Sequence, residues 1–291
     1  MKCEKCGNPV KRTLADNCVS RLKLYKTVAY YCDHCDKIYI LEKYKDIIAE
    51  NKYDDEIFFD KYSQMDRSKK GLAGAGEWHE LKKMLPDFKG KRILDLGCGF
   101  GWHCIYAMEQ GAVSAVGIDI SSKMLEEAKK KTKFSNVEYI QMPIEDIHFE
   151  KNSFDIVISS LAFHYIESFE NICRKVNECL VEDGDFVFSV EHPVFTAQGK
   201  EDWHYDENGN ILHWPVDSYY LEGKRESVFL GEKVVKYHKT LTTYLNTLLK
   251  NNFNITGIVE AQPSSEMLES IPEMKDELRR PMMLLVSAKK R

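Results

Sequence analysis

Ile93-Leu94-Asp95-Leu96-Gly97-Cys98-Gly99-Phe100-Gly101 is the stretch that decides the fold. A short apolar run carrying one acid passes directly into three glycines at alternate positions, and an amphipathic segment, residues 104–110, follows. This order predicts a strand, a tight turn and a helix. Glycines let such a turn adopt positive φ and let its backbone approach a ligand closely, while the first N–H groups of the new helix face that ligand.

A second acid lies where a nucleotide-binding unit needs one. The next apolar run ends in Asp119, about twenty residues after the turn, where Rossmann units keep an acid for ribose hydroxyls. The glycine pattern is G-x-G-x-G, not the dinucleotide pattern G-x-G-x-x-G. A turn that needs no pyrophosphate, with Asp95 placed to accept from an ammonium group, suits S-adenosylmethionine. An NAD-type domain and a glycine turn without a ligand are the alternatives.

With these two motifs the chain resembles the class I S-adenosylmethionine-dependent methyltransferases over about residues 55–291, and within them the branch that holds ubiquinone and menaquinone biosynthesis enzymes. The resemblance implies an α/β fold: a doubly wound, mostly parallel, Rossmann-like sheet of seven strands, the last one antiparallel. It also implies cofactor contacts. Gly97, Cys98 and Gly99 would line the cofactor, Asp119 would hold its ribose, and Ile120 would pack on adenine.

Further cofactor contacts are expected on either side of these motifs. In related enzymes an element before the first strand closes over the cofactor, so Tyr62 and Arg67 are expected at its carboxylate end. A core helix with a solvated arginine is the other interpretation. The loop after the third strand clasps adenine, and here Pro143 stands where many relatives carry Asp. Adenine recognition is therefore assigned to the Ile144 backbone and to Glu145.

The ends of the fourth and fifth strands supply the candidate catalytic residues. Ligands of doubly wound sheets lie beyond these ends, so Ser160 is assigned to the cofactor and His164 to the methyl acceptor. A neutral imidazole there can take a proton as the methyl group arrives, with Glu191 and His192 in support. A histidine that only packs against the start of a helix is the alternative.

The segment from about residue 191 to 240 breaks the strand–helix rhythm and is rich in aromatic residues and histidines. An insertion at this place often forms a substrate lid, so the expected acceptor is an apolar or ring-shaped small molecule. The histidine separations follow no metal-ligand pattern, which favours hydrogen bonding as their role. No Asn/Asp-Pro-Pro-aromatic sequence and no Pro-Cys nucleophile follow the fourth strand, which argues against methylation of exocyclic base amines and of cytosine C5.

Four cysteines near the start of the chain form a second pattern. Cys3 and Cys6 make one C-x-x-C pair, Cys32 and Cys35 make another, and the residues between them alternate as strands do. Two such pairs supply four thiolates for a tetrahedral, structural zinc ion. A disulfide pair or a redox motif would not explain why both pairs bracket a short β-rich module that lacks a core of its own.

Three parts are expected: a zinc-ribbon-like module at residues 1–45, helices closing over the cofactor at 46–90, and the S-adenosylmethionine-binding domain at 91–291. The module carries ten Lys and Arg against five Asp and Glu, whereas the whole chain has a net charge of −5. Because these positive charges are spread out, a structural cap is favoured over a surface for RNA or protein. Cys18 and His34 are alternative zinc ligands within the module.

The composition is that of an ordinary globular protein. The chain has 291 residues, 43% of them hydrophobic and 30% charged, without an apolar run of membrane-span length or a signal peptide. Its nine cysteines form no extracellular framework, which favours a cytoplasmic location and no membrane partner. The preferred function is methyl transfer to oxygen, carbon or nitrogen of a small acceptor. An RNA methyltransferase and a non-catalytic cofactor-binding partner protein are the alternatives, and the oligomeric state is not predicted.

Overall fold

The computed structural model describes residues 51–291 and, before them, residues 2–3, 5–9, 11–19, 22–32, 34–35 and 37–39. The charged segment at residues 42–51, which the sequence predicts to be a helix-prone linker, therefore lies outside the described residues except for Asn51. Within the three N-terminal strands only the side chain of Cys32 is described.

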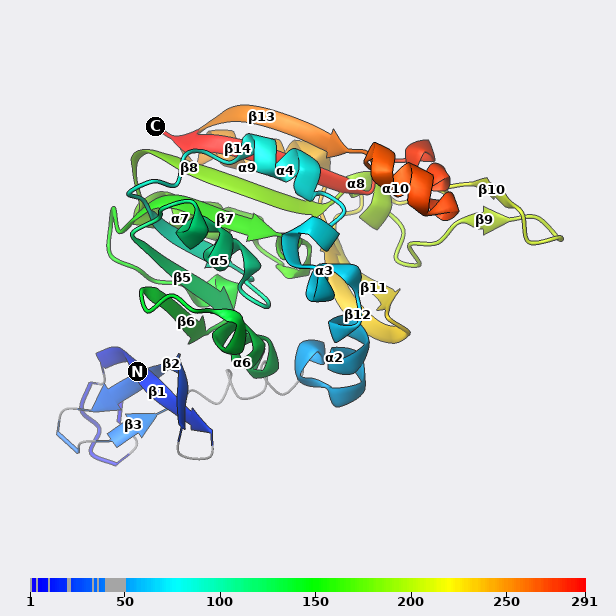
Figure 1. Ribbon diagram of the computed structural model, residues 1–291. Coiled ribbons are helices and arrows are strands. Elements are labelled where there is room, and N and C mark those ends of the chain that lie inside the picture. The colour runs from blue at the N-terminus through cyan, green and yellow to red at the C-terminus, as the bar shows by residue number, and fades with distance from the viewer. Residues whose placement is uncertain are drawn as a thin grey trace.

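Strands and helices alternate through the main domain as the sequence predicts (Figure 1). The elements up to the fifth strand of this domain are β4 (Arg92–Leu96), α5 (Trp102–Glu109), β5 (Ser114–Asp119), α6 (Ser122–Lys131), β6 (Val137–Gln141), η3 (Ile144–Asp146), β7 (Phe154–Ser160), η4 (Phe163–Tyr165), α7 (Phe169–Cys179) and β8 (Leu180–Glu191). The elements after the insertion are α9 (Leu241–Lys250), β13 (Phe253–Ala261), α10 (Ser265–Ser270), η5 (Pro272–Arg279) and β14 (Met283–Lys290).

Seven strands of the main domain form one sheet in the order β6-β5-β4-β7-β8-β14-β13. The strands from β6 to β8 are parallel, whereas β14 runs antiparallel to both of its neighbours, β8 and β13. The predicted doubly wound sheet with an antiparallel last strand is confirmed. Reversal of the strand order next to β4 places a ligand crevice beyond the carboxyl ends of β4 and β7.

Both faces of the sheet are covered, which is why its central strands read as continuous apolar runs (Figure 1). On one face α7 and α9 pack on alternate residues of the strands, among them Leu94, Val157 and Phe186. On the other face α5 and α6 pack on the intervening residues, such as Ile93 and Ile158. Helix α4 (Trp78–Met84) covers the same face farther along, where Leu81 meets Val187 and Leu285.

The N-terminal strands continue this sheet instead of forming a separate one. β1 (Lys11–Val19) and β3 (Lys37–Tyr39) both pair antiparallel with β2 (Leu22–Cys32). β2 in turn pairs parallel with β6, with Lys26 opposite Ile140 and Thr27 opposite Gln141. The sheet therefore has ten strands, and the cysteine-bearing module lies at its β6 edge (Figure 1). The sequence predicted the module and its strands, but not this junction.

Short helices precede the first strand of the main domain: η1 (Lys52–Asp54), α2 (Glu56–Ser63), α3 (Asp66–Lys69) and η2 (Gly71–Gly74), followed by α4. The sequence predicts a glycine hinge at residues 71–76. Two of its glycines instead serve close packing, since a Cβ at Gly74 would lie 2.3 Å from the Asp66 carbonyl oxygen and one at Gly71 would lie 3.1 Å from the Trp102 ring.

The insertion after β8 consists of a short helix and two hairpins. Its elements are α8 (Pro193–Thr196), β9 (His204–Tyr205), β10 (Ile211–His213), β11 (Gly223–Phe229) and β12 (Glu232–His238). In Figure 1 the β9–β10 hairpin projects far from the sheet, whereas β11 and β12 lie near α2 and α3. None of the helices in the described part of the chain is long and apolar enough to cross a membrane.

Candidate functional site

The glycine turn after β4 provides both tight packing and open space. Gly97, Gly99 and Gly101 have φ values of 76°, 50° and 73°. A Cβ at Gly97 would lie 2.5 Å from the Ala162 Cβ, and one at Gly101 would lie 2.1 Å from the Tyr139 hydroxyl. A Cβ at Gly99 would meet nothing within 4 Å. The turn therefore packs against the protein at its two ends and leaves its middle open to a ligand.

Asp119 ties the second strand of the motif to this turn. Its carboxylate accepts hydrogen bonds from the backbone N–H groups of Gly99, at 2.8 Å, and Ser121, at 2.9 Å. Burial raises the pKa of Asp119 to about 6, although these hydrogen bonds act in the opposite direction. The structure thus brings together the turn and the acid that the sequence assigns to one ligand.

Asp95 is fully buried at the end of β4. Its Oδ2 faces the Cys104 thiol at 3.7 Å, while its Oδ1 has no hydrogen-bond partner among the described residues. Burial raises the pKa of this carboxyl to about 7. A buried carboxylate oxygen without a partner is costly, and a ligand cation satisfies it. The carboxylate oxygens of Asp95 and Asp119 are acceptors that fit the ammonium group and the ribose hydroxyls of S-adenosylmethionine.

The N-terminal helices lie over the turn. Asp54 accepts hydrogen bonds from the Ser121 hydroxyl, at 2.6 Å, and from the Lys123 N–H, at 3.1 Å, so it caps the start of α6 two residues after Asp119. The Tyr53 and Tyr165 hydroxyls are 3.2 Å apart. These contacts attach η1, the first of the N-terminal helices, to α6 and to η4, which carries the candidate catalytic histidine.

Tyr62 and Arg67 come together with Ser160 through a residue that the sequence analysis missed. The Tyr62 ring packs edge-on against Phe100 of the glycine turn. Glu77, only 1% exposed, accepts from Arg67 at 3.2 Å and from the Ser160 hydroxyl at 2.8 Å. Burial acts to raise the pKa of Glu77, but the Arg67 charge holds it below its usual value. Arg67 is therefore paired and mostly buried, not solvated.

Of the residues assigned to adenine, Ile144 lies beside the same turn. Ile144 is buried, and its Cδ1 would lie 3.4 Å from a Cβ at Gly97. The backbone oxygen of Ile120 accepts from the Gln141 side chain, and that of Glu145 accepts from Lys175. The Glu145 carboxyl has a raised pKa because it is largely buried. Cys98 is buried beneath the turn, which raises the pKa of its thiol well above the usual value.

The three candidate catalytic residues are only partly brought together. His164, 2% exposed, accepts the Glu191 N–H at its Nδ1, at 3.4 Å, and its Nε2 lies 3.9 Å from the Glu191 carboxylate. Burial, and then the charges of Lys236 and Lys239, lower the pKa of His164 well below its usual value, so the imidazole is neutral. The His192 ring instead accepts the Val194 N–H and lies 2.9 Å from Glu260. It contacts neither His164 nor the Glu191 carboxylate.

A buried lysine and a second glutamate complete the surroundings of Glu191. The Lys236 ammonium lies 2.7 Å from Glu191 Oε1 and 2.6 Å from Glu201 Oε2. No pattern in the sequence indicates this group, because its three members are separated by ten and thirty-five residues along the insertion, in no helical or strand period. Lysine and glutamate at such positions normally indicate a solvated face.

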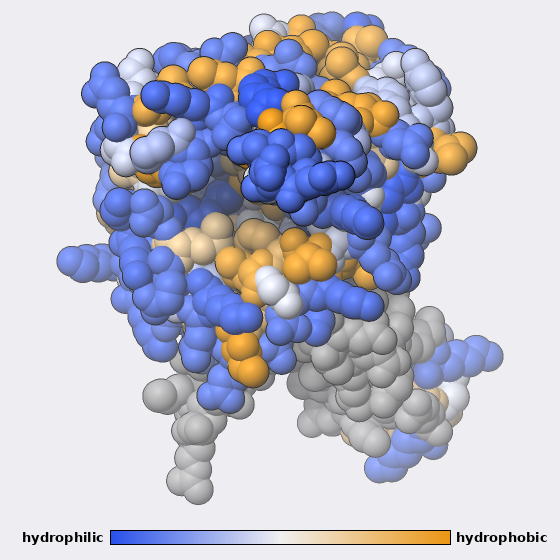
Figure 2. All heavy atoms as spheres, turned by 90° about the vertical axis from the view of Figure 1, so that its right-hand side faces the viewer, coloured by the Kyte–Doolittle hydropathy of each residue, from blue (hydrophilic) through white to orange (hydrophobic). Residues whose placement is uncertain are grey.

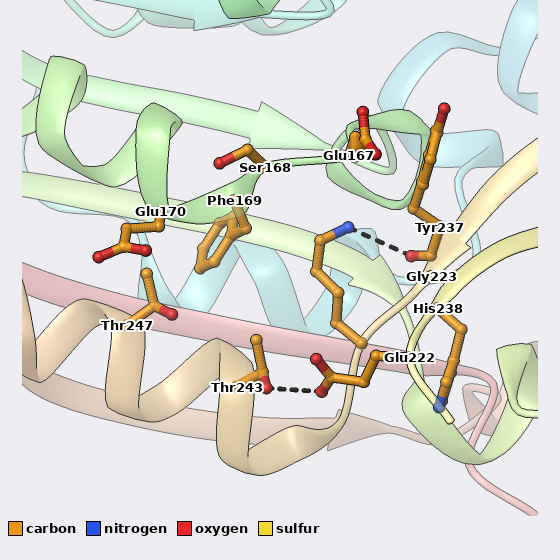
Figure 3. Close-up of a pocket in the computed structure, with 11 residues that line it drawn as sticks. Glu167, Ser168, Phe169, Glu170, Glu222, Gly223, Tyr237, His238, Thr243 and Thr247 are labelled. Carbon is orange, nitrogen blue, oxygen red and sulfur yellow. Dashed lines mark hydrogen bonds between the residues drawn. The ribbon is translucent and has the colours of Figure 1, made fainter. Parts of the chain in front are cut away.

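The face of the molecule that lies on the right in Figure 1 is hollowed. Figure 2 looks onto it and shows hydrophobic atoms in a recess bordered by hydrophilic residues. A separate groove of about 350 Å³ lies between the start of α7, the β11–β12 hairpin and α9 (Figure 3). Its walls include Glu167, Glu222 and Tyr237, and Glu222 accepts from Thr243 within it. The insertion thus helps to form a concave surface.

The four predicted metal ligands converge. The Sγ atoms of Cys3, Cys6, Cys32 and Cys35 all lie within 4.8 Å of one another, and those of Cys6 and Cys32 are 3.6 Å apart. A Zn–S distance of about 2.3 Å in a tetrahedron requires sulfur atoms roughly 3.8 Å apart. The geometry therefore fits zinc. His34 is exposed, and the side chain of Cys18 lies outside the described residues.

Known proteins resemble the chain in sequence and in structure. A family described as "Methyltransferase domain" matches residues 94–188. An uncharacterised protein of Haemophilus influenzae is 33% identical over 249 residues, which are 82% of this chain and 96% of that protein.

Two solved structures match 76% of this chain. One, from Listeria monocytogenes, is provisionally assigned as an S-adenosylmethionine-dependent methyltransferase; it is 61% identical, with a TM-score of 0.73 and 99% of its length covered. The other is an S-adenosylmethionine-dependent methyltransferase from Mesorhizobium loti, 42% identical, with a TM-score of 0.71 and its whole length covered. Both matches leave roughly a quarter of this chain without a counterpart.

Proposed function

The chain belongs to the S-adenosylmethionine-dependent methyltransferases, and from this premise we propose that it methylates an oxygen, carbon or nitrogen atom of a small-molecule acceptor. One observation carries the choice of a small acceptor. Beyond the ends of β7 and β8, His164 of η4 and Lys236 of the insertion itself are almost fully buried. Such an enclosed site suits a small molecule, whereas single-stranded RNA is bound along basic, open grooves.

In this proposal the glycine turn and the N-terminal helices hold the cofactor. The cofactor supplies an activated methyl group on its sulfonium sulfur. Asp119 accepts from the ribose hydroxyls, Asp95 accepts from the ammonium group, and Arg67 and Tyr62 face the carboxylate. Ser160 acts through Glu77, which fixes Arg67. The remaining proposed contacts are the lining by Gly97, Cys98 and Gly99 and the adenine contacts of Ile120, Ile144 and Glu145.

The proposed catalytic residues have separate parts. His164 is neutral and is held against the Glu191 backbone, so it positions the end of β8 beside the acceptor. Glu191 presents its carboxylate to the acceptor. His192 has an indirect role. Its ring caps α8 and pairs with Glu260, and these two contacts fix the end of β8 that carries Glu191. Catalysis would come mainly from holding the acceptor in line with the methyl group.

Calorimetric titration tests the cofactor. We expect micromolar binding of S-adenosylmethionine and S-adenosylhomocysteine and none of NADH. Asp119→Ala should weaken binding by about a hundredfold, since it removes charge-assisted hydrogen bonds to ribose. Asp155→Ala is the matched control: this acid pairs with Arg92 at the far end of the sheet, so affinity should be unchanged. Binding of NADH alone would refute the proposal.

Transfer of a radiolabelled methyl group into fractionated cell extract tests the acceptor class. Label is expected in the small-molecule fraction. Label in the RNA fraction would support methyltransferase activity but contradict a small-molecule acceptor. Salt-sensitive binding of RNA would then be expected as well. Cofactor binding without label in any fraction would instead favour a non-catalytic partner protein.

We propose that Cys3, Cys6, Cys32 and Cys35 hold a structural zinc ion in a module at residues 1–45, followed by the cofactor cover at 46–90 and the main domain at 91–291. The convergence of the four sulfur atoms supports the site. Replacing Cys32 and Cys35 by Ser should release the metal, as measured by elemental analysis. Cys173→Ala, in buried α7, should retain one zinc per chain. Stoichiometric zinc in the double variant would remove these ligands from the proposal.

A further inference from the structure

We propose that Glu191, Lys236 and Glu201 form a proton-accepting triad at the acceptor site, and that the acceptor is a neutral molecule presenting an O–H or N–H group to Glu191. The inference rests on the proposed function and narrows it, because it excludes acceptors that are methylated at carbon. It also assigns roles to Lys236 and Glu201, as residues that position Glu191 and share its proton.

The triad joins three elements that are distant in the sequence. Glu191 ends β8, Glu201 follows α8, and Lys236 lies on β12. The Lys236 side chain is 2% exposed, Glu201 is 6% exposed and Glu191 is 15% exposed. One ammonium group contacts both carboxyl groups, and the Ser227 hydroxyl donates to Glu201 Oε2 as well. Such an arrangement holds the two carboxyl groups next to each other.

The charges of the triad do not balance unless it carries an extra proton. Two ionised carboxylates and one ammonium would leave a net charge of −1 in a buried site, which is strongly unfavourable. One proton shared between Glu191 and Glu201 makes the triad neutral. In agreement, burial raises the pKa values of both carboxyl groups, that of Glu201 to about 7.

Other described groups around the triad form no ion pair with it. The Lys239 ammonium group, whose charge acts on His164, donates to the backbone oxygens of Ile166 and Tyr237. His164 on η4 faces Glu191 and is neutral, and Tyr165 and Tyr244 nearby have phenol pKa values raised by burial. Lys236 is the cation in direct contact with the two carboxyl groups among the described residues. The protonation of the triad is therefore set within the triad itself.

The triad faces the place where an acceptor must lie. Glu191 Oε2 and Glu201 Oε1 are buried, and neither has a hydrogen-bond partner in the part of the chain that the structure describes. Ser189, two residues before Glu191 on the same face of β8, donates to Ser160, which contacts Glu77 on the cofactor side. Two residues along a strand span about 7 Å, which leaves room for one acceptor group between cofactor and carboxylate.

The proton balance of the reaction fits this site. The acceptor oxygen or nitrogen forms a bond to the methyl carbon, the sulfur–carbon bond breaks with its electron pair remaining on sulfur, and the acceptor's proton passes to Glu191. The site loses the positive charge of the sulfonium and gains that of the proton, so its total charge is unchanged. A buried site favours such a charge-conserving step, because no new charge has to be created there.

Infrared spectroscopy on protein saturated with S-adenosylhomocysteine tests the shared proton. At neutral pH we expect a C=O stretching band of a protonated carboxylic acid that disappears in Glu201→Gln and in Glu191→Gln. Glu260→Gln, an exposed carboxylate on β13, should leave the band unchanged. If neither substitution alters the protonated-carboxyl band, the triad does not hold the proton. Calorimetry of the same samples reports separately whether the cofactor site, and with it the proposed function, is intact.

Methyl transfer to the small-molecule fraction tests the role in turnover. Glu191→Gln should slow transfer by about a hundredfold or more while leaving cofactor affinity unchanged. Glu201→Gln should move the acidic limb of the pH–rate profile to higher pH, because Glu191 loses the neighbouring carboxyl group that shares its proton and favours its ionisation. A residue with only a structural role would not move this limb. Labelled products methylated at carbon would overturn the acceptor class.

Discussion

Buried carboxylates are stabilised in different ways on the two sides of the site, next to the glycine turn and next to the insertion. Asp95 and Asp119 form hydrogen bonds to a thiol and to backbone N–H groups, and no described residue forms an ion pair with either. Glu191 and Glu201 instead share the ammonium group of Lys236. The first side is thus prepared for a cation that arrives with the cofactor, whereas the second side carries its own.

The largest difference is expected when the internal cation is removed. Lys236→Met leaves two buried carboxyl groups without their ammonium partner, so the free energy of unfolding should fall by about 3–5 kcal/mol at neutral pH. Lys52→Met is the control. It breaks a 3.9 Å contact between the exposed side chains of Lys52 and Glu232, and should cost below about 0.5 kcal/mol. Urea denaturation of both variants measures the contrast, and equal losses would contradict it.

A pair of glycine substitutions separates packing from ligand space on the other side. Gly97→Ala combines a left-handed φ, costing about 1–2 kcal/mol, with a clash against Ala162 that adds about 1–3 kcal/mol. Gly99→Ala has the φ penalty alone, because its Cβ meets no described atom within 4 Å. Its methyl group enters the proposed cofactor space, so it should weaken cofactor affinity about tenfold despite the smaller loss of stability.

Thermal denaturation and calorimetry, applied to both glycine variants, check this. If Gly99→Ala destabilised the fold as much as Gly97→Ala, the middle of the turn would not be open.

The smallest effect is a pH dependence of cofactor affinity. The pKa values of Asp95 and Asp119 are raised to about 7 and about 6, and a bound ammonium group and ribose favour the ionised forms. Affinity should therefore rise as the pH increases from about 5.5 to 7.5, by at most about tenfold per pH unit for each proton released. In Asp95→Asn the upper part of this rise should disappear. An affinity independent of pH would mean that both acids are ionised without the ligand.

The same comparison explains what could be predicted from the sequence. Asp95, the glycines and Asp119 belong to one strand–turn–helix–strand unit, so their spacing already determines that they meet, and the predicted sheet is confirmed. Lys236 and Glu201 approach Glu191 only because the insertion folds back on the sheet. The hydrophobic residues of the insertion follow no regular period, so the sequence does not indicate which of its side chains are buried. Glu77 precedes α4 and turns its carboxylate inward to Arg67, a contact that no spacing in the sequence indicates.

The junction between β2 and β6 has a consequence for biosynthesis. Lys26 and its partner Ile140 are more than a hundred residues apart in the sequence, so the module leaves the ribosome long before the strand that receives it has been made. Until then β2 is an open strand edge, which pairs readily with other chains. Binding of metal to the four cysteines would hold the nascent module in shape during this interval, so zinc supply during translation should govern the yield of correctly assembled protein.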